Sequence, residues 1–136
     1  MNYWLVKTEP DVYSWEKFVK EGRAVWDGVR NYQARNNLIK MKIGDRVLFY
    51  HSNVGKEVVG IAEVGKESFP DPTSKESGWA AVELMPVGVL RKPVTLGEIR
   101  REPALKNMPL VRHSRLSVLP VTAAEFSMIL KISGGG

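Results

Sequence analysis

The sequence predicts an α+β fold, in which an antiparallel or mixed sheet curls towards a small barrel flanked by short helices. Several stretches rich in branched and aromatic residues alternate apolar and polar character, which is typical of strands. Two Thr-x-x-Glu patterns mark the starts of short helices. Glycine, proline, asparagine and aspartate separate these stretches, so the elements follow one another through turns.

The first third of the chain predicts one strand and two helices. Tyr3–Thr8 alternates around a Trp-Leu-Val core and predicts a strand that opens the sheet. Trp15–Glu21 predicts a short helix, because Ser14 supplies an N-cap and Gly22 a stop. Apolar residues at helical spacing predict a second helix over residues 32–41.

The middle of the chain predicts three successive antiparallel strands. They cover Arg46–His51, residues 58–64 and residues 79–90, all rich in branched and aromatic side chains. Residues 69–77 hold two prolines and several charges and predict a surface loop.

The last third predicts two short helices on either side of a strand. Residues 95–98 and 122–125 match the capping box, in which Thr and Glu satisfy amide donors at a helix start. Residues 114–121 predict a strand edged by proline. We expect residues 1–133 to form a single domain and the glycine tail, residues 134–136, to be disordered.

Composition narrows the possible functions. The chain has no cysteine, so it forms no disulfide and no thiolate zinc site, which fits a reducing cytoplasm. We expect a soluble cytoplasmic protein without membrane contact, since neither a signal peptide nor a membrane span is evident. The formal net charge of +5 favours a polyanionic partner such as nucleic acid.

The most unusual segment, residues 26–37, combines aromatic residues, arginines and side-chain amides around a predicted helix start. Asn31 and Arg35 stand one turn apart on the face opposite the apolar residues. Free amides at a helix start beside guanidinium groups suit a phosphate or a base edge. The competing interpretation is that Asn31 only caps the helix, Trp26 fills the core and the arginines are solvated.

Two further polar spots have ordinary structural explanations. His51 ends an apolar strand and either faces a pocket mouth or forms a hydrogen bond at the strand end. The basic turn at residues 110–115 is either a binding loop or a solvated one.

The sequence gives little support for an enzymatic activity. No histidines stand at metal-ligand spacing, no carboxylates pair into an evident dyad, and no phosphate-cradling glycine loop is present. We therefore expect no metal, no cofactor and no catalytic residue.

Four segments taken together resemble the EVE-domain family, a PUA-like group that includes bacterial homologues of thymocyte nuclear protein. They cover residues 3–10, residues 26–36, residues 49–52, and Arg112 with Ser114 and Arg115 in the late turn. The resemblance runs over essentially the whole chain, and the run Trp-Asp-Gly-Val-Arg-Asn-Tyr-Gln-Ala-Arg-Asn is its most specific part.

The resemblance implies a PUA-like β-barrel related to YTH and ASCH domains. It also implies a pocket for a modified base flipped from DNA or RNA, with 5-methylcytosine or a related modified cytosine as the expected ligand. The ligand-binding residues would be Lys7, Trp26, Val29, Asn31, Tyr50, His51, Ser52, Leu110 and Arg112. Arg30, Arg35 and Arg115 would contact the nucleic-acid backbone.

Three hypotheses remain open from the sequence. The first is a non-enzymatic reader of a modified base, whose downstream action requires an effector protein. The second is an amidohydrolase acting on an acylated nucleobase, as in ASCH relatives, with Lys7, Thr8 and Glu9 as candidate groups; strand alternation turns Thr8 away from the other two. The third is a protein-interaction domain with an incidental basic surface.

Overall fold

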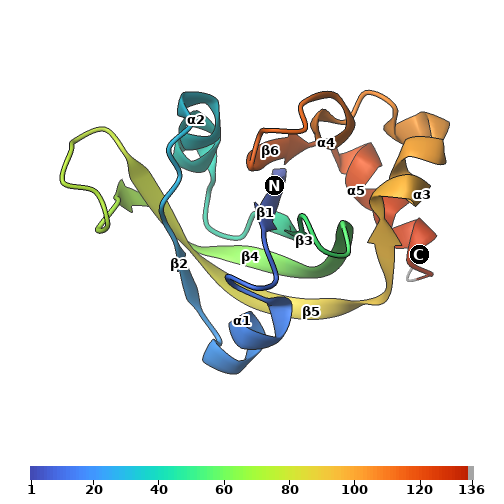
Figure 1. Ribbon diagram of the computed structural model, residues 1–136, viewed down its shortest axis with the longest axis horizontal. Helices are drawn as coiled ribbons and strands as arrows, with labels where there is room; N and C mark the ends of the chain where they lie inside the picture. The colour runs from blue at the N-terminus through green and yellow to red at the C-terminus, as the bar shows by residue number, and fades with distance from the viewer. Residues whose placement is uncertain (135–136) are drawn as a thin grey trace.

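Six strands form one sheet in the computed structural model, which describes residues 1–134 (Figure 1). The strands are β1 (Tyr3–Thr8), β2 (Ala24–Trp26), β3 (Arg46–His51), β4 (Glu57–Pro70), β5 (Ala80–Thr95) and β6 (Val118–Val121). The helices are α1 (Trp15–Glu21), α2 (Tyr32–Lys40), α3 (Leu96–Arg101), α4 (Pro109–Arg112) and α5 (Ala123–Ile132), with a 3-10 turn η1 (Pro103–Leu105). The predicted α+β class is confirmed.

The strand order across the sheet is β2-β5-β4-β3-β1-β6. β3, β4 and β5 follow one another antiparallel, as predicted. β1 pairs with β6 antiparallel but with β3 in parallel. Because parallel neighbours cannot be joined by a tight turn, the chain builds α1, β2 and α2 before it returns to the sheet as β3.

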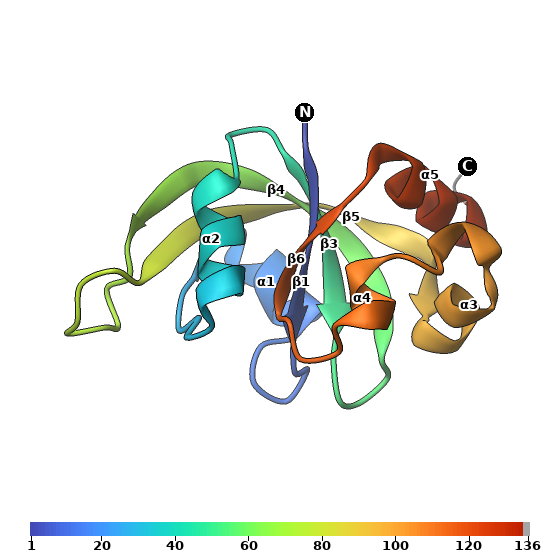
Figure 2. The same ribbon diagram turned by 90° about the horizontal axis from the view of Figure 1, so that it is seen from above.

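The two longest strands give the sheet its curl. β4 has 14 residues and β5 has 16, and their pairing shifts register at several points. Such irregularities bend and twist a strand pair. Both strands curve across the molecule, with the loop of residues 71–79 projecting at one end (Figure 2).

Some predicted boundaries were wrong. β4 continues to Pro70 and β5 to Thr95, beyond the expected residues 58–64 and 79–90, because the end of β4 still pairs with the start of β5 and the end of β5 with the start of β4. β6 is shorter than the expected residues 114–121. The expected loop begins at Asp71 rather than at residue 69, and β2, η1 and α4 were not predicted.

Helix ends follow the local sequence closely. The Ser14 side chain accepts the Lys17 amide at 3.1 Å, and Gly22 ends α1 in the left-handed conformation with φ +76°. Both predicted capping boxes form, one between Thr95 and Glu98 and the other at the start of α5. The first two helix predictions hold to within one residue.

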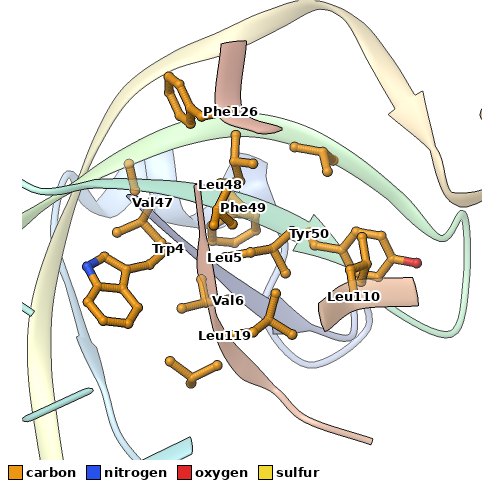
Figure 3. Close-up of a cluster of buried hydrophobic side chains, with 14 of the residues drawn as sticks. Trp4, Leu5, Val6, Val47, Leu48, Phe49, Tyr50, Leu110, Leu119 and Phe126 are labelled. Atoms are coloured by element: carbon orange, nitrogen blue, oxygen red, sulfur yellow. The ribbon is translucent and has the colours of Figure 1, made fainter. Parts of the chain in front are cut away.

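The core lies between the sheet and its helices (Figure 3). Side chains of β1, β3 and β6 gather there, among them Leu5, Leu48 and Leu119. Phe18 of α1 stacks on Phe49 of β3, with ring centroids 5.2 Å apart. This packing fixes α1 against β3 and leaves the ends of β1 and β3 at the edge of the core.

Gly60 allows a close approach between β4 and α1. A Cβ built on Gly60 would lie 2.5 Å from the Trp15 ring. Trp15 also meets Phe49 edge-on, with centroids 5.2 Å apart. The missing side chain on β4 therefore makes room for the indole.

The C-terminal end is described up to Gly134, so Gly135 and Gly136 of the expected disordered tail lie outside the described residues. The Gly134 N–H donates to the Lys131 carbonyl at 3.0 Å, and its carbonyl accepts a hydrogen bond from Arg91 at 3.3 Å. Among residues 1–134, no helix has the length and apolar character needed to cross a membrane.

Candidate functional site

A first cavity, cavity 1, has a volume of about 550 Å³ and opens beside Trp26. Its walls come from the end of β1, the segment before α1, β2, and the segment that joins β2 to α2. The lining residues are Lys7, Thr8, Val12, Tyr13, Glu21, Arg23, Ala24, Val25, Trp26, Asp27, Gly28, Val29, Arg30, Asn31 and Ser117. Pockets for small ligands have volumes in this range.

Trp26 is half-buried at the edge of the sheet, where it pairs with Val82 of β5. Its ring meets Phe49 edge-on at a centroid distance of 5.7 Å and Tyr13 at 6.2 Å. These two contacts fix the orientation of the indole from the core side. Trp26 is also part of the wall of cavity 1.

The buried carboxylate of Asp71 organises the segment that follows Trp26. One carboxylate oxygen accepts the Gly28 amide at 2.9 Å and the Arg30 guanidinium at 2.9 Å. The other accepts both the backbone N–H and the hydroxyl of Thr73 at 2.7 Å. Burial alone would raise the pKa of Asp71, but the hydrogen bonds from Thr73, Arg30 and Gly28 hold it well below its usual range. Asp71 is therefore ionised and ties the β4–β5 loop to the wall of cavity 1.

Asp27 and Asn31 supply polar groups to the same wall. Burial and the nearby charge of Asp71 raise the pKa of Asp27, against the opposing effects of its own backbone and of Arg30. Asn31 caps α2, since its Oδ1 accepts the Ala34 amide at 2.9 Å. Asn31 thus serves the helix, as one interpretation of the sequence held, and also lines the cavity.

Four side chains form a rim cluster next to cavity 1: Arg30, Tyr32, Arg35 and Trp79. Tyr32 stacks on Trp79 with centroids 5.1 Å apart, and Arg30 lies over Trp79 at 5.4 Å. Arg35 lies over Tyr32 at 5.0 Å and donates to the Gly78 carbonyl at 3.1 Å. Tyr32 remains 66% exposed, so an aromatic surface faces solvent here.

A second cavity, cavity 2, has a volume of about 450 Å³ and lies at the other side of the β1 end. Its lining residues are Lys7, Thr8, Glu9, Tyr50, Ser52, Asn53, Lys56, Leu96, Arg100, Leu110, Ser114, Arg115 and Ser117. Tyr50 and Leu110, both buried, lie close together at this end of the core (Figure 3). Burial raises the pKa of Tyr50, while the charge of Arg100 acts in the opposite direction.

Lys7, Thr8 and Ser117 line both cavities and form the wall between them. The Lys7 ammonium donates to the Ser114 carbonyl at 2.8 Å, and the Lys7 backbone N–H donates to the Ser117 carbonyl at 2.9 Å. Burial lowers the pKa of the Lys7 ammonium.

The predicted site residues are divided between these places rather than gathered in one pocket. Trp26, Val29, Asn31 and Arg30 line cavity 1, whereas Tyr50, Ser52, Leu110 and Arg115 line cavity 2, and Lys7 lines both. His51, Arg112 and Arg35 line neither.

His51 and Arg112 make structural contacts. The His51 Nε2 accepts the Trp15 backbone N–H at 3.0 Å, which is the strand-end role that the sequence left open. Burial lowers the pKa of His51, and Glu57 and Glu16 oppose this effect. Arg112 donates to the Asn107 side chain at 2.9 Å on the surface.

Other lining residues were not predicted, among them Tyr13, Asp27, Lys56 and Arg100. Asp71 and Tyr32 were missed as well. Tyr13, Lys56, Asp71 and Arg100 belong to segments of ordinary composition, and only the folded chain brings them to the cavities or to their walls. The one available signal was the aromatic residue Tyr32 inside the most unusual segment of the sequence.

Comparisons with known proteins agree over nearly the whole chain. The family model of the EVE domain matches residues 2–132. Mouse thymocyte nuclear protein 1 is 36% identical, over 96% of this chain and 73% of that protein. A crystal structure from Agrobacterium tumefaciens is 46% identical with a TM-score of 0.97, covering 98% of this chain and 94% of that one.

Two of the similar structures contain nucleic acid. Human THYN1, solved in complex with 5-methylcytosine containing DNA, is 32% identical with a TM-score of 0.85 and covers 98% of both chains. The YTH domain of Zygosaccharomyces rouxii MRB1, solved with N6-methyladenosine RNA, shares the fold at a TM-score of 0.62 and 18% identity, covering 97% of this chain and 86% of that one. The expected PUA-like architecture is thereby confirmed.

Proposed function

Since the chain belongs to the EVE-domain family, we propose that it binds a modified nucleobase, flipped from DNA or RNA into cavity 1, without catalysing a reaction. The observation that carries this proposal is a ligand-sized cavity with an oriented tryptophan in its wall. The human relative in complex with 5-methylcytosine containing DNA supports the choice of 5-methylcytosine or a related modified cytosine as ligand.

The energetics of cavity 1 fit a flipped base. Extruding a base from a duplex costs a few kcal/mol, and one aromatic stack returns about 1–3 kcal/mol. Stacking on Trp26 therefore offsets much of the free-energy cost of extruding the base. A single-stranded target needs no unpairing and should bind more tightly.

Selectivity for the modification needs more than the methyl group. Burying one methyl contributes about 0.8 kcal/mol, roughly a fourfold preference. Hydrogen bonds to the base edge add further discrimination, because an unmatched edge leaves buried polar groups unpaired. The Asp27 side-chain oxygens are suited to accept an exocyclic amine, and the Asn31 amide nitrogen is suited to donate to a ring nitrogen or carbonyl.

The rim cluster supports binding of the strand around the flipped base. Exposed Tyr32 offers a stacking face, and Arg35 stands beside it with a guanidinium group. The Arg30 charge is largely taken up by Asp71. Arg35 is therefore the stronger candidate for a backbone contact.

The test is a fluorescence titration with matched DNA and RNA oligonucleotides that carry cytosine, 5-methylcytosine, 5-hydroxymethylcytosine or N6-methyladenine. We expect Trp26→Ala to weaken binding of the preferred oligonucleotide by about 5- to 150-fold, which corresponds to the loss of one stack. Trp26→Phe keeps an aromatic face and should retain most of the affinity. The thermal unfolding of both variants serves as the control for folding. A Trp26→Ala protein that still distinguishes modified from plain oligonucleotides as the wild type does would refute the proposal.

The alternative is the amidohydrolase acting on an acylated nucleobase. The observation in its favour is the lowered pKa of Lys7, which lies in the wall of both cavities and carries a larger neutral fraction than an exposed lysine. Its ammonium is held by the Ser114 carbonyl, and Glu9 lines only cavity 2. Steady turnover of an acylated nucleoside that is lost in Lys7→Ala would establish this alternative.

The same proposal covers three wider features. Residues 1–133 act as one module, whose single sheet and continuous core connect both cavities. The protein works in the cytoplasm, and an effector protein acts on the bound nucleic acid after recognition. Co-purification of a partner only in the presence of the modified oligonucleotide would support the last point.

A further inference from the structure

Cavity 2 differs from cavity 1 in its charge. Lys7, Lys56, Arg100 and Arg115 line it, against a single carboxylate, that of Glu9. In cavity 1, Glu21 and Asp27 stand against Lys7, Arg23 and Arg30, and Arg30 is paired with Asp71. One cavity is therefore nearly balanced in charge, and the other is strongly positive.

The lysine and arginine side chains of cavity 2 remain available for a bound anion. No ion pair formed within residues 1–134 involves Lys56, Arg100 or Arg115. Like charges that converge on one hollow repel each other, and an anion bound there removes that repulsion. Hydroxyl groups complete the lining as hydrogen-bond donors; they belong to Tyr50, Ser52, Ser114 and Ser117.

Three separate parts of the fold fix the position of this charge. Lys56 ends the β3–β4 turn, and its carbonyl accepts the Leu96 amide at 2.8 Å, which ties the turn to the start of α3. Arg100 lies on α3, which is held by its own capping box. Arg115 follows α4, whose buried Leu110 also lines cavity 2.

The two cavities are neighbours, because Lys7, Thr8 and Ser117 line both of them. Within a nucleotide the base and the phosphate are likewise separated by a single sugar. From this arrangement we infer that cavity 2 binds a phosphate of the same strand whose base occupies cavity 1. The inference rests on the proposed function, and it assigns to Lys56, Arg100 and Arg115 a role in holding the backbone phosphate.

The test compares Arg100→Gln with Arg101→Gln, its neighbour on α3 that lines neither cavity. Single-stranded oligonucleotides with 5-methylcytosine or cytosine are titrated over a range of salt concentrations. Arg100→Gln should weaken binding by roughly tenfold at low salt, the size of one lost charge-assisted hydrogen bond. It should also reduce the slope of log affinity against log salt by about 0.7, while the preference for 5-methylcytosine stays unchanged. Arg101→Gln should leave the affinity and the preference close to those of the wild type.

A second set of probes separates a strand phosphate from a free one. The probes are 5-methyl-2′-deoxycytidine, its 5′- and 3′-monophosphates, and inorganic phosphate. We expect one monophosphate to bind more tightly than the nucleoside, and Arg100→Gln to remove that advantage without changing nucleoside binding. Equal losses in Arg100→Gln and Arg101→Gln would overturn the inference. So would Arg100-dependent binding of inorganic phosphate together with oligonucleotide binding that is insensitive to Arg100.

Failure of the proposed function would look different. In that case the wild type would show no preference among the modified bases. The contrast between Arg100→Gln and Arg101→Gln on a plain oligonucleotide would still report on cavity 2.

Discussion

Single side chains in this protein often serve the fold and the site together. Asp71 illustrates this, because its buried carboxylate joins the β4–β5 loop to Gly28 and Arg30 beside cavity 1. Asn31 caps α2 and lines the same cavity. Substitutions at such residues change stability and binding at once, so binding data on them need a folding control.

The His51 imidazole predicts a pH-dependent stability. Its neutral form accepts the Trp15 amide, and burial lowers its pKa below the ordinary value of 6.5. As the pH falls, the unfolded chain binds a proton before the folded one, so the free energy of unfolding decreases. The decrease begins as the pH approaches 6.5 and is complete below the lowered pKa of the folded state.

Urea denaturation at about pH 8 and about pH 5 measures this effect. In His51→Gln the amide oxygen replaces the imidazole as an acceptor that does not titrate, so the difference between the two pH values should shrink. An equal loss of stability in wild type and variant would contradict the assignment.

Local chemistry made some of the site predictable from the sequence. Trp26 and Asn31 were identified within one dense segment, the family resemblance added Val29, and the three residues line one cavity together. Tyr50 and Ser52 were expected beside them but lie at cavity 2, because the end of β1 stands between the two groups. No pattern in the sequence reveals such a wall, which forms only when β1 pairs with β3.

At the scale of elements, helix starts were predicted best, because a cap depends on residues only three positions apart. Strand ends were predicted less well. The polar residues near the end of β4 look like a loop in the sequence, yet β5 supplies the partner that keeps them in the sheet. The short strand β2 was missed because pairing with β5 defines it more than its own composition does.

The contact between β4 and α1 predicts an unusually sensitive glycine. Gly60→Ala should lower the free energy of unfolding by about 1–3 kcal/mol, since the added methyl group forces the rigid Trp15 ring to move. Gly88→Ala on β5 is the matched control, because a Cβ there meets nothing within 4 Å. Urea denaturation of both variants measures the difference. Equal stability of the two variants would mean that Trp15 does not pack on Gly60 as described.

The whole molecule carries a net charge of +5, and its cavities lie on either side of one strand end. The parallel pairing of β1 and β3 creates this arrangement, and periodicity alone did not predict that topology. The barrel-like curl was predicted from the pattern of strands and helices, and the family was predicted from four separated segments. The difference in charge between cavity 1, which is nearly neutral, and cavity 2, which is basic, could be recognised only from the folded structure.

Two contributions to affinity should therefore respond differently to salt. Contacts between the protein and the nucleic-acid backbone weaken as the salt concentration rises. Neutralising the phosphates releases their counterions, and this release is less favourable at high salt. Stacking and base-edge contacts in cavity 1 are short-ranged and respond much less. We expect modified and plain oligonucleotides to lose affinity in parallel, with their ratio constant, in titrations from low to moderate salt. A ratio that falls towards one at higher salt would place the discrimination in the backbone contacts instead.

The position of β1 also constrains the order in which the molecule is assembled. Trp4 pairs with Val47 on one side and with Pro120 on the other, so β1 receives its second neighbour only after the other strands of the sheet have been synthesised. A chain emerging from the ribosome holds an apolar strand with an open edge until β6 arrives. The wall between the two cavities therefore closes only after β6 has joined β1, and a nascent chain acquires its binding site no earlier than that.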